Sequence, residues 1–165
     1  MHPTQNPVSP ATPPTIADTL RRAALYLIRH GWTRDNHYAK PAAPVILRTP
    51  GTFPAADVVG ALVLAVTGRT LIPAEVHAEA GPDAHRELAA AITYLVDWLG
   101  LEDRPGLDDR RALADWNDSP WQDQAHVVDG LLCAAADADG TLYRPDLHRP
   151  YAADFAALGL KAGAR

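Results

Sequence analysis

The stretch LYLIRHGWTRDN, residues 25–36, contains the residue types and spacing that come closest to catalytic chemistry. An apolar run there is followed directly by Arg29, His30 and Gly31. A histidine in such a position can act as a nucleophile that accepts a phosphoryl group, and a neighbouring arginine can hold the phosphate oxygens. That chemistry requires the apolar run to be a strand whose end presents His30.

The apolar residues around this stretch favour a helix instead of a strand. Four of them recur at positions i, i+4, i+7 and i+8 and so share one helical face: Leu20, Ala24, Leu27 and Ile28. We therefore predict a helix over residues 16–30 that begins after a Thr15 cap and ends at Gly31. His30 then lies in the last turn, near backbone carbonyls that a protonated imidazole can meet.

The sequence supports neither of two kinds of hydrolase, a histidine phosphatase or a metal-dependent enzyme. A histidine phosphatase needs a second histidine and a second arginine, which that family carries in a Ser-x-Leu-x-Arg-Ala segment and at the end of a late strand; this chain has neither. Four metal-capable residues lie close in sequence: His77, Glu79, Asp83 and His85. Such clusters on an acidic protein are more often solvated than metal-bound, so we predict no metal and no cofactor.

Composition and charge predict one small, cytoplasmic domain. The chain has 165 residues, 47% of them hydrophobic, which is enough for a substantial core. The net charge of -5 and the near-absence of lysine disfavour a nucleic-acid partner. The longest apolar run, residues 58–66, is too short to span a bilayer, and no secretory signal is recognisable. The single Cys133 excludes an internal disulfide and suits a reducing compartment.

The apolar periodicity predicts an all-α fold, a compact bundle of about five helices. The helices are expected over residues 16–30, 55–67, 83–99, 108–116 and 120–137. Residues 45–47 and 37–38 are predicted to pair as a short two-stranded hairpin between the first two helices. We further predict a disordered Pro-rich arm over residues 1–14, a helical domain over 15–140, and a tail with a short helix over 141–165.

The same periodicity predicts the core and the start of the last helix. One residue from each of four helices should be buried together: Leu27, Leu62, Leu95 and Val128. Ser119 is expected to cap the last helix in a capping box with Gln122. Five residues should form the buried stripe of this helix: Trp121, Ala125, Val128, Leu132 and Ala135. Gly130 interrupts the helix, at a cost of about 1 kcal/mol relative to alanine unless something packs closely there.

Three landmarks resemble an uncharacterised family of small proteins from actinobacteria and their phages. They are the helix ending in Gly31 and Trp32, the Gly-Ala-Leu helix at residues 60–62, and Trp-Asn-Asp-x-Pro at residues 116–120. The resemblance covers roughly residues 20–136, and it implies the helical fold. Many members carry a cysteine where this chain has Asp57. The family has no assigned activity, so the resemblance implies none.

Four residues are candidates for contact with a partner or ligand: Trp32, Trp116, Asn117 and Asp118. The alternative interpretation is structural, with Trp116 packed under a helix junction and the two polar side chains bonded to backbone in a turn. Short polar side chains before a helix favour the structural interpretation.

We predict a non-enzymatic module that binds a protein partner, with a homodimer as one form of that interaction. The alternative is a small hydrolase, either histidine-phosphatase-like or metal-dependent, that uses His30 or the region of His77 and His85. The positions of the histidines discriminate between the two. A hydrolase needs two histidines and two arginines in one pocket, whereas scattered histidines favour the module.

Overall fold

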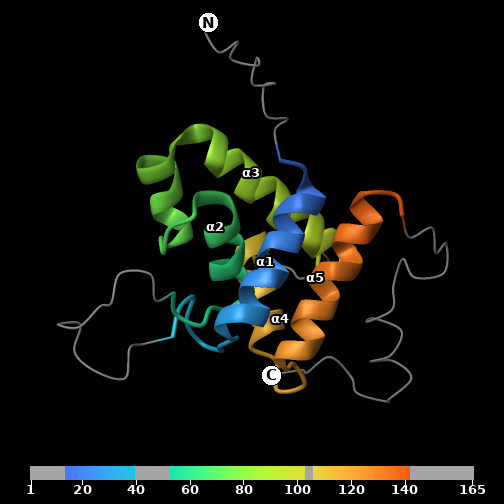
Figure 1. Cartoon of the computed structure of the whole chain (residues 1–165). Coiled ribbons are helices and arrows are strands. Elements are labelled where there is room, and N and C mark those ends of the chain that lie inside the picture. The colour runs from blue at the N-terminus through green and yellow to red at the C-terminus, as the bar shows by residue number, and fades with distance from the viewer. Residues whose placement is uncertain (1–13, 40–52, 103–105, 142–165) are drawn as a thin grey trace, which may run out of the picture.

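A computed structural model describes residues 14–39, 53–102 and 106–141, and five α-helices dominate them (Figure 1). They are α1 (Ile16–His30), α2 (Val58–Thr67), α3 (Val76–Trp98), α4 (Asp109–Asn117) and α5 (Gln124–Ala138), with a short 3-10 helix, η2 (Pro73–Glu75). These residues contain no strand, which confirms the predicted all-α class. No helix among them is long and apolar enough to cross a membrane.

The helix α2 lies at the centre of the core. Residues 58–64 are all buried, which explains why α2 is apolar on every side. The helix α1 packs lengthwise against both α2 and α5, and α3 covers α2 from another side (Figure 1). Three of the four predicted core residues, Leu27, Leu62 and Leu95, are fully buried together.

The helix α1 has the predicted bounds because its two ends are defined locally. Thr15 accepts a hydrogen bond from the Asp18 backbone at 3.1 Å, and the Asp18 carboxylate accepts one in return from the Thr15 backbone. This is a capping box. At the other end, Gly31 takes a positive φ of 91°, which glycine adopts without strain. Ile28, predicted to be on the buried face, is 53% exposed.

The starts of α2 and α3 differ from the prediction. The helix α2 begins at Val58 and not at residue 55, because the backbone of Ala56 forms bridges with Trp32 and Tyr38 and stays extended. The helix α3 begins at Val76, before the predicted residue 83, because two helical segments follow each other there across a kink at Gly81, where φ is 91°. The hairpin strand predicted at residues 45–47 lies outside the described residues, as do most of the predicted arm and tail.

The helix α5 corrects two predictions. It begins at Gln124, capped by Asp123, which accepts a hydrogen bond from the His126 backbone at 2.8 Å. The predicted Ser119 cap is wrong, because the Ser119 carbonyl accepts from the Gln122 backbone in a turn at 3.0 Å.

The buried stripe of α5 includes the predicted Ala135, but Val127 and Leu131 take the places predicted for Val128 and Leu132. The buried residues are Val127, Gly130, Leu131, Ala134 and Ala135, whereas the predicted Trp121 and Leu132 are exposed and Val128 is half-buried. Because residues 127–128 and 131–132 are adjacent apolar pairs, either of two apolar stripes on this helix could be buried: residues 127 and 131, or residues 128 and 132. Packing against α1 selects the first of them.

Candidate functional site

Asn117, at the end of α4, joins three segments of the chain. It is fully buried, and its Oδ1 accepts hydrogen bonds from the Trp32 indole at 2.7 Å and the Val58 backbone at 3.1 Å. Its Nδ2 donates to the Thr33 carbonyl at 3.2 Å and to Asp118 Oδ1 at 2.8 Å. An amide has two acceptor and two donor positions, so the protein itself uses the whole hydrogen-bonding capacity of Asn117.

Trp32 and Asp118 belong to the same network. The same Asp118 oxygen accepts from the backbone of Asp35 at 3.0 Å, and Asp35 has a positive φ of 64°. The Arg34 guanidinium lies 5.0 Å from the centre of the Trp32 ring, within the range of a cation–π contact, and it donates to the Gln122 carbonyl. The structure therefore brings three of the four candidate residues together around the loop that follows α1.

Trp116, the fourth candidate, lies apart from this network. It is 5% exposed, and its ring packs on Gly130 of α5, with Cη2 3.6 Å from where a Cβ on Gly130 would stand. Among the described residues, its buried Nε1 has no hydrogen-bond partner. Trp116 thus contributes mainly apolar packing between α4 and α5.

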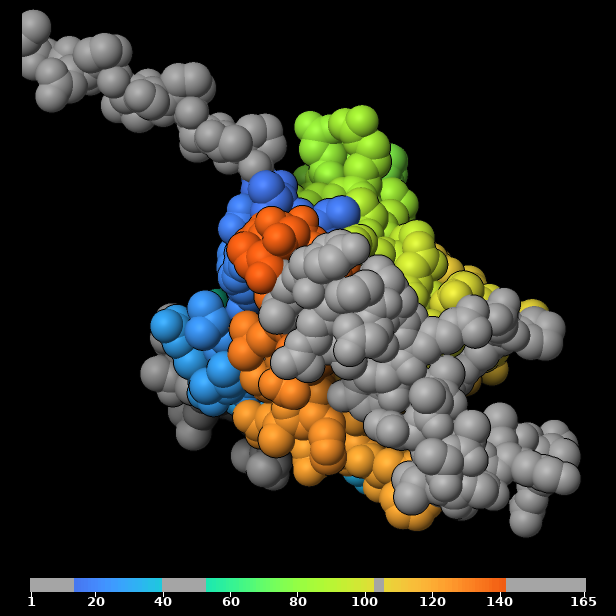
Figure 2. Space-filling view, turned by 90° about the vertical axis from the view of Figure 1, so that its right-hand side faces the viewer, coloured from blue at the N-terminus to red at the C-terminus, as the bar shows by residue number. Residues whose placement is uncertain are grey.

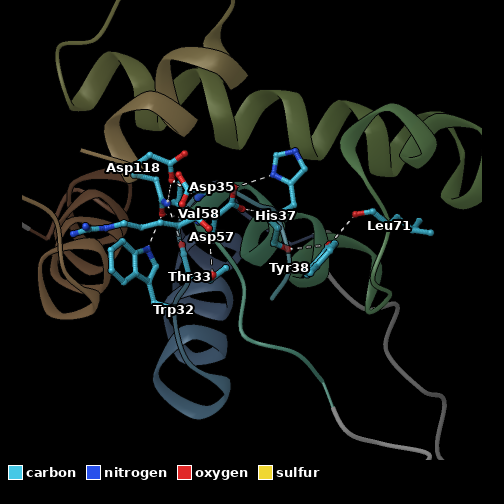
Figure 3. Close-up of polar contacts among 12 residues, drawn as sticks. Trp32, Thr33, Asp35, His37, Tyr38, Asp57, Val58, Leu71 and Asp118 are labelled. Carbon is cyan, nitrogen blue, oxygen red and sulfur yellow. Dashed lines mark hydrogen bonds and ion pairs between the residues drawn. The ribbon is translucent and has the colours of Figure 1, made fainter. Parts of the chain in front are cut away.

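A second polar contact, between His37 and Asp57, was not singled out from the sequence as a site. His37 Nδ1 lies 2.9 Å from Asp57 Oδ2, and Asp57 is only 3% exposed (Figure 3). The other oxygen of Asp57 accepts from the Gly60 backbone at 2.6 Å and caps α2. The hydrogen bond to Asp57 raises the pKa of His37, and partial burial opposes this. The N-cap position of Asp57 was a detectable signal, but nothing in the spacing pointed to His37.

Gly60 is where the loop after α1 crosses α2 most closely. A Cβ at this position would stand 2.2 Å from the His37 carbonyl oxygen. The same carbonyl accepts a hydrogen bond from the Asp57 backbone at 3.2 Å. The Tyr38 hydroxyl holds the next residue of the loop by donating to the Leu71 carbonyl at 2.7 Å. Only glycine permits this approach of backbone to helix.

His30 lies in the last turn of α1, as the helical interpretation predicted. Its ring contacts Tyr26 at 4.6 Å and Phe53 at 5.5 Å between ring centres. The strand that a histidine phosphatase would need at residues 25–29 is a helix instead. His30 is therefore part of an aromatic cluster at the end of α1.

The metal-capable group at residues 77–85 does not converge. The rings of His77 and His85 meet edge to face at 5.5 Å, whereas Glu79 and Asp83 form ion pairs with arginines. Within the part of the chain that the structure describes, no three His, Cys, Asp or Glu side chains are placed to hold a metal ion.

The helices α1 and α5 pack antiparallel. Arg21, near the start of α1, forms an ion pair with Asp139 just after α5. At the opposite end, the Gln124 side chain donates to the Leu27 carbonyl at 2.9 Å. Figure 2 shows the first turns of α1 in blue beside the last turn of α5 in red-orange.

Large apolar side chains are exposed where these two helices meet. Leu25 and Ile28 follow Arg21 at i+4 and i+7, so they share the flank of α1 that reaches α5. By the same spacing, Val128 and Leu132 share the flank of α5 that carries Asp139. Leu25 is 45%, Ile28 53% and Leu132 39% exposed. We call these four apolar residues the α1/α5 face.

These observations define a small all-α protein with a buried polar network and an exposed apolar face on two adjacent helices. The chain belongs to a family whose function is not known: the model of the "Family of unknown function (DUF6197)" matches residues 11–138. This confirms the prediction of membership in a family without assigned activity, and the predicted actinobacterial or phage origin stays a prediction. No curated protein and no solved structure matches the chain.

Proposed function

We propose that the chain is a non-enzymatic, cytoplasmic protein-interaction module whose α1/α5 face binds a protein partner. The observation that carries the proposal is the exposure of Leu25 and Ile28 on α1 and of Leu132 on α5, two helices that pack against each other. Apolar surface removed from water contributes about 25 cal/mol per Å². Grouped apolar side chains on a surface therefore favour a protein contact, whereas single ones need no explanation.

The polar candidate residues form hydrogen bonds within the chain itself, and this supports the same proposal. Asn117 makes four hydrogen bonds within the chain and has none left for a ligand. In this proposal Trp32, Asn117 and Asp118 hold the loop after α1 in place, and Trp116 packs α4 on α5. These residues stabilise the scaffold, and the α1/α5 face makes the contact.

The distribution of the histidines argues against the hydrolase alternative. His30 contacts aromatic rings, His37 contacts Asp57, His77 contacts His85, and His126 lies 3.1 Å from Asp123. Among the described histidines, His77 and His85 meet each other, while the neighbouring Arg69 and Arg86 pair with carboxylates, and His30, His37 and His126 lie in three other places. A phosphoryl-transfer site would need two of them beside two arginines.

Site-specific photo-cross-linking in the native host tests this proposal. A photoreactive phenylalanine analogue is placed at Ile28 or at Leu132, and at Ile72 as the matched control, because Ile72 is 46% exposed outside the α1/α5 face. We expect protein adducts from the first two positions and none from the third. Adducts of equal yield at all three positions, or no adduct at Ile28 and Leu132, would contradict the proposal.

A further inference from the structure

We infer that the protein which covers the α1/α5 face is a second copy of this chain, an inference that rests on the proposed function of that face. The two copies form a two-fold dimer in which α1 of each copy lies against α5 of the other. The resulting interface contains the same α1–α5 contact twice, as isologous interfaces do.

Charge complementarity between the two helices carries the inference. Three arginines and one aspartate give α1 a net charge of +2, while two aspartates give α5 a net charge of -2, with His126 neutral. Arg29 and Asp129 are both exposed, and neither forms an ion pair with another residue of the described chain. Each helix thus offers unpaired charge of the sign that the other attracts.

Because α1 and α5 are antiparallel within one copy, only one orientation of the two-fold axis brings these opposite charges together. Gln124 at the start of α5 contacts Leu27 near the end of α1, so Arg29, two residues past Leu27, and Asp129, five residues past Gln124, lie about 10 Å apart along the helix axes. A two-fold axis that runs parallel to the helices, between the two copies, places α1 opposite the partner's α5 and leaves the position of each residue along the helix axes unchanged. Side chains lean toward the N-terminus of their own helix, so Arg29 and the partner's Asp129 lean toward each other across this offset, as do the partner's Arg29 and Asp129.

The other simple arrangement is disfavoured by the same charges. An axis across the helices would place α1 against the partner's α1, which sets arginines against arginines, and α5 against the partner's α5, which sets aspartates against aspartates. Like charges placed opposite each other across an interface oppose binding. Two alanines on the outer side of α5, the exposed Ala125 and the half-buried Ala136, leave room for a helix to approach closely.

Sedimentation of the purified full chain over a concentration series tests the dimer. We expect a dimer that dissociates on dilution, a monomer for Ile28→Glu, and an unchanged dimer for the control Ile72→Glu. Circular dichroism of each variant shows whether the fold is retained. A wild-type chain that sediments as a monomer throughout would overturn the inference.

A charge exchange tests the predicted pairing even if Ile28→Glu fails to fold. Arg29→Glu and Asp129→Arg should each weaken the dimer by about tenfold, since each places like charges together twice. An equal mixture of the two variants should restore dimers of mixed composition, because opposite charges then meet at both contacts. A mixture no tighter than either variant alone would overturn the pairing.

These results separate the two proposals. If the purified chain is monomeric but the cross-linker at Ile28 captures a different protein, the dimer fails and the proposed function stands. If the chain is monomeric and no adduct forms, both fail.

Discussion

Replacement of Gly60 by alanine should destabilise the protein, although the position is helical. Alanine gains about 0.5–1 kcal/mol over glycine inside a helix. Against this, the new Cβ would stand 2.2 Å from the His37 carbonyl oxygen, which is backbone and cannot rotate away. Such overpacking typically costs about 1–3 kcal/mol, so we expect a net loss of about 1–2 kcal/mol.

Gly130→Ala is the matched control, because it is the same change in another buried helical position. Its Cβ would meet the Trp116 ring at 3.6 Å, an ordinary van der Waals contact. The helix-propensity gain then remains, and we expect about 0.5–1 kcal/mol of stabilisation. The glycine that interrupts α5 is thus a replaceable residue, whereas Gly60 is not.

Urea unfolding of the three proteins measures both effects, and the chemical shifts of His37 report on the local cause. In Gly60→Ala the loop after α1 must move, so the contact of His37 with Asp57 should weaken and the raised pKa of His37 should fall toward its ordinary value. Stabilisation of Gly60→Ala by as much as Gly130→Ala would refute the reasoning, since it would mean that the loop yields without cost.

Three further changes test the network and the core. Asn117→Ala should cost about 2–4 kcal/mol in unfolding experiments, because it leaves the buried Val58 N–H and the Trp32 indole without their acceptor; an unchanged denaturation midpoint would contradict this. Since the folded pKa of His37 is raised, its stabilising effect is present below the unfolded value of about 6.5 and is lost as pH rises through the folded pKa. The loss of stability in His37→Gln should therefore be larger near pH 6 than near pH 8.5, measured by thermal unfolding, and a pH-independent difference would argue against the ion pair. Leu95→Ala should cost about 2–5 kcal/mol, and an unaltered thermal midpoint would show that Leu95 is not a core residue.

The antiparallel pair of α1 and α5 brings together two helices of opposite net charge. The helix α1 has a net charge of +2 and α5 one of -2, and within one copy Arg21 of α1 pairs with Asp139 just after α5. Exposed ion pairs contribute little to folding, typically between zero and about 1 kcal/mol. Arg29 and Asp129 form no ion pair within the described chain, and in the proposed dimer they orient the second copy.

The sequence alone determined the helices whose signals are local. Thr15, Asp18 and Gly31 define the ends of α1 through hydrogen bonds within a few residues, and the i, i+4 spacing of Leu20 and Ala24 identifies its buried face. The apolar pattern of residues 58–64 is likewise typical of a helix at the centre of a core, which is where α2 lies. Such features follow from helix geometry and from the aversion of apolar groups to water, without knowledge of the fold.

Only the tertiary structure decided which of two equivalent patterns is buried and which distant polar groups meet. In α5, Val127 and Val128 are alike in hydrophobicity, and contact with α1 selects Val127. The hydrogen bond between Trp32 and Asn117 spans 85 positions, and that between His37 and Asp57 spans 20. The physical reason is that periodicity determines the direction of a side chain from its own helix axis, whereas a contact between segments depends on how the helices pack.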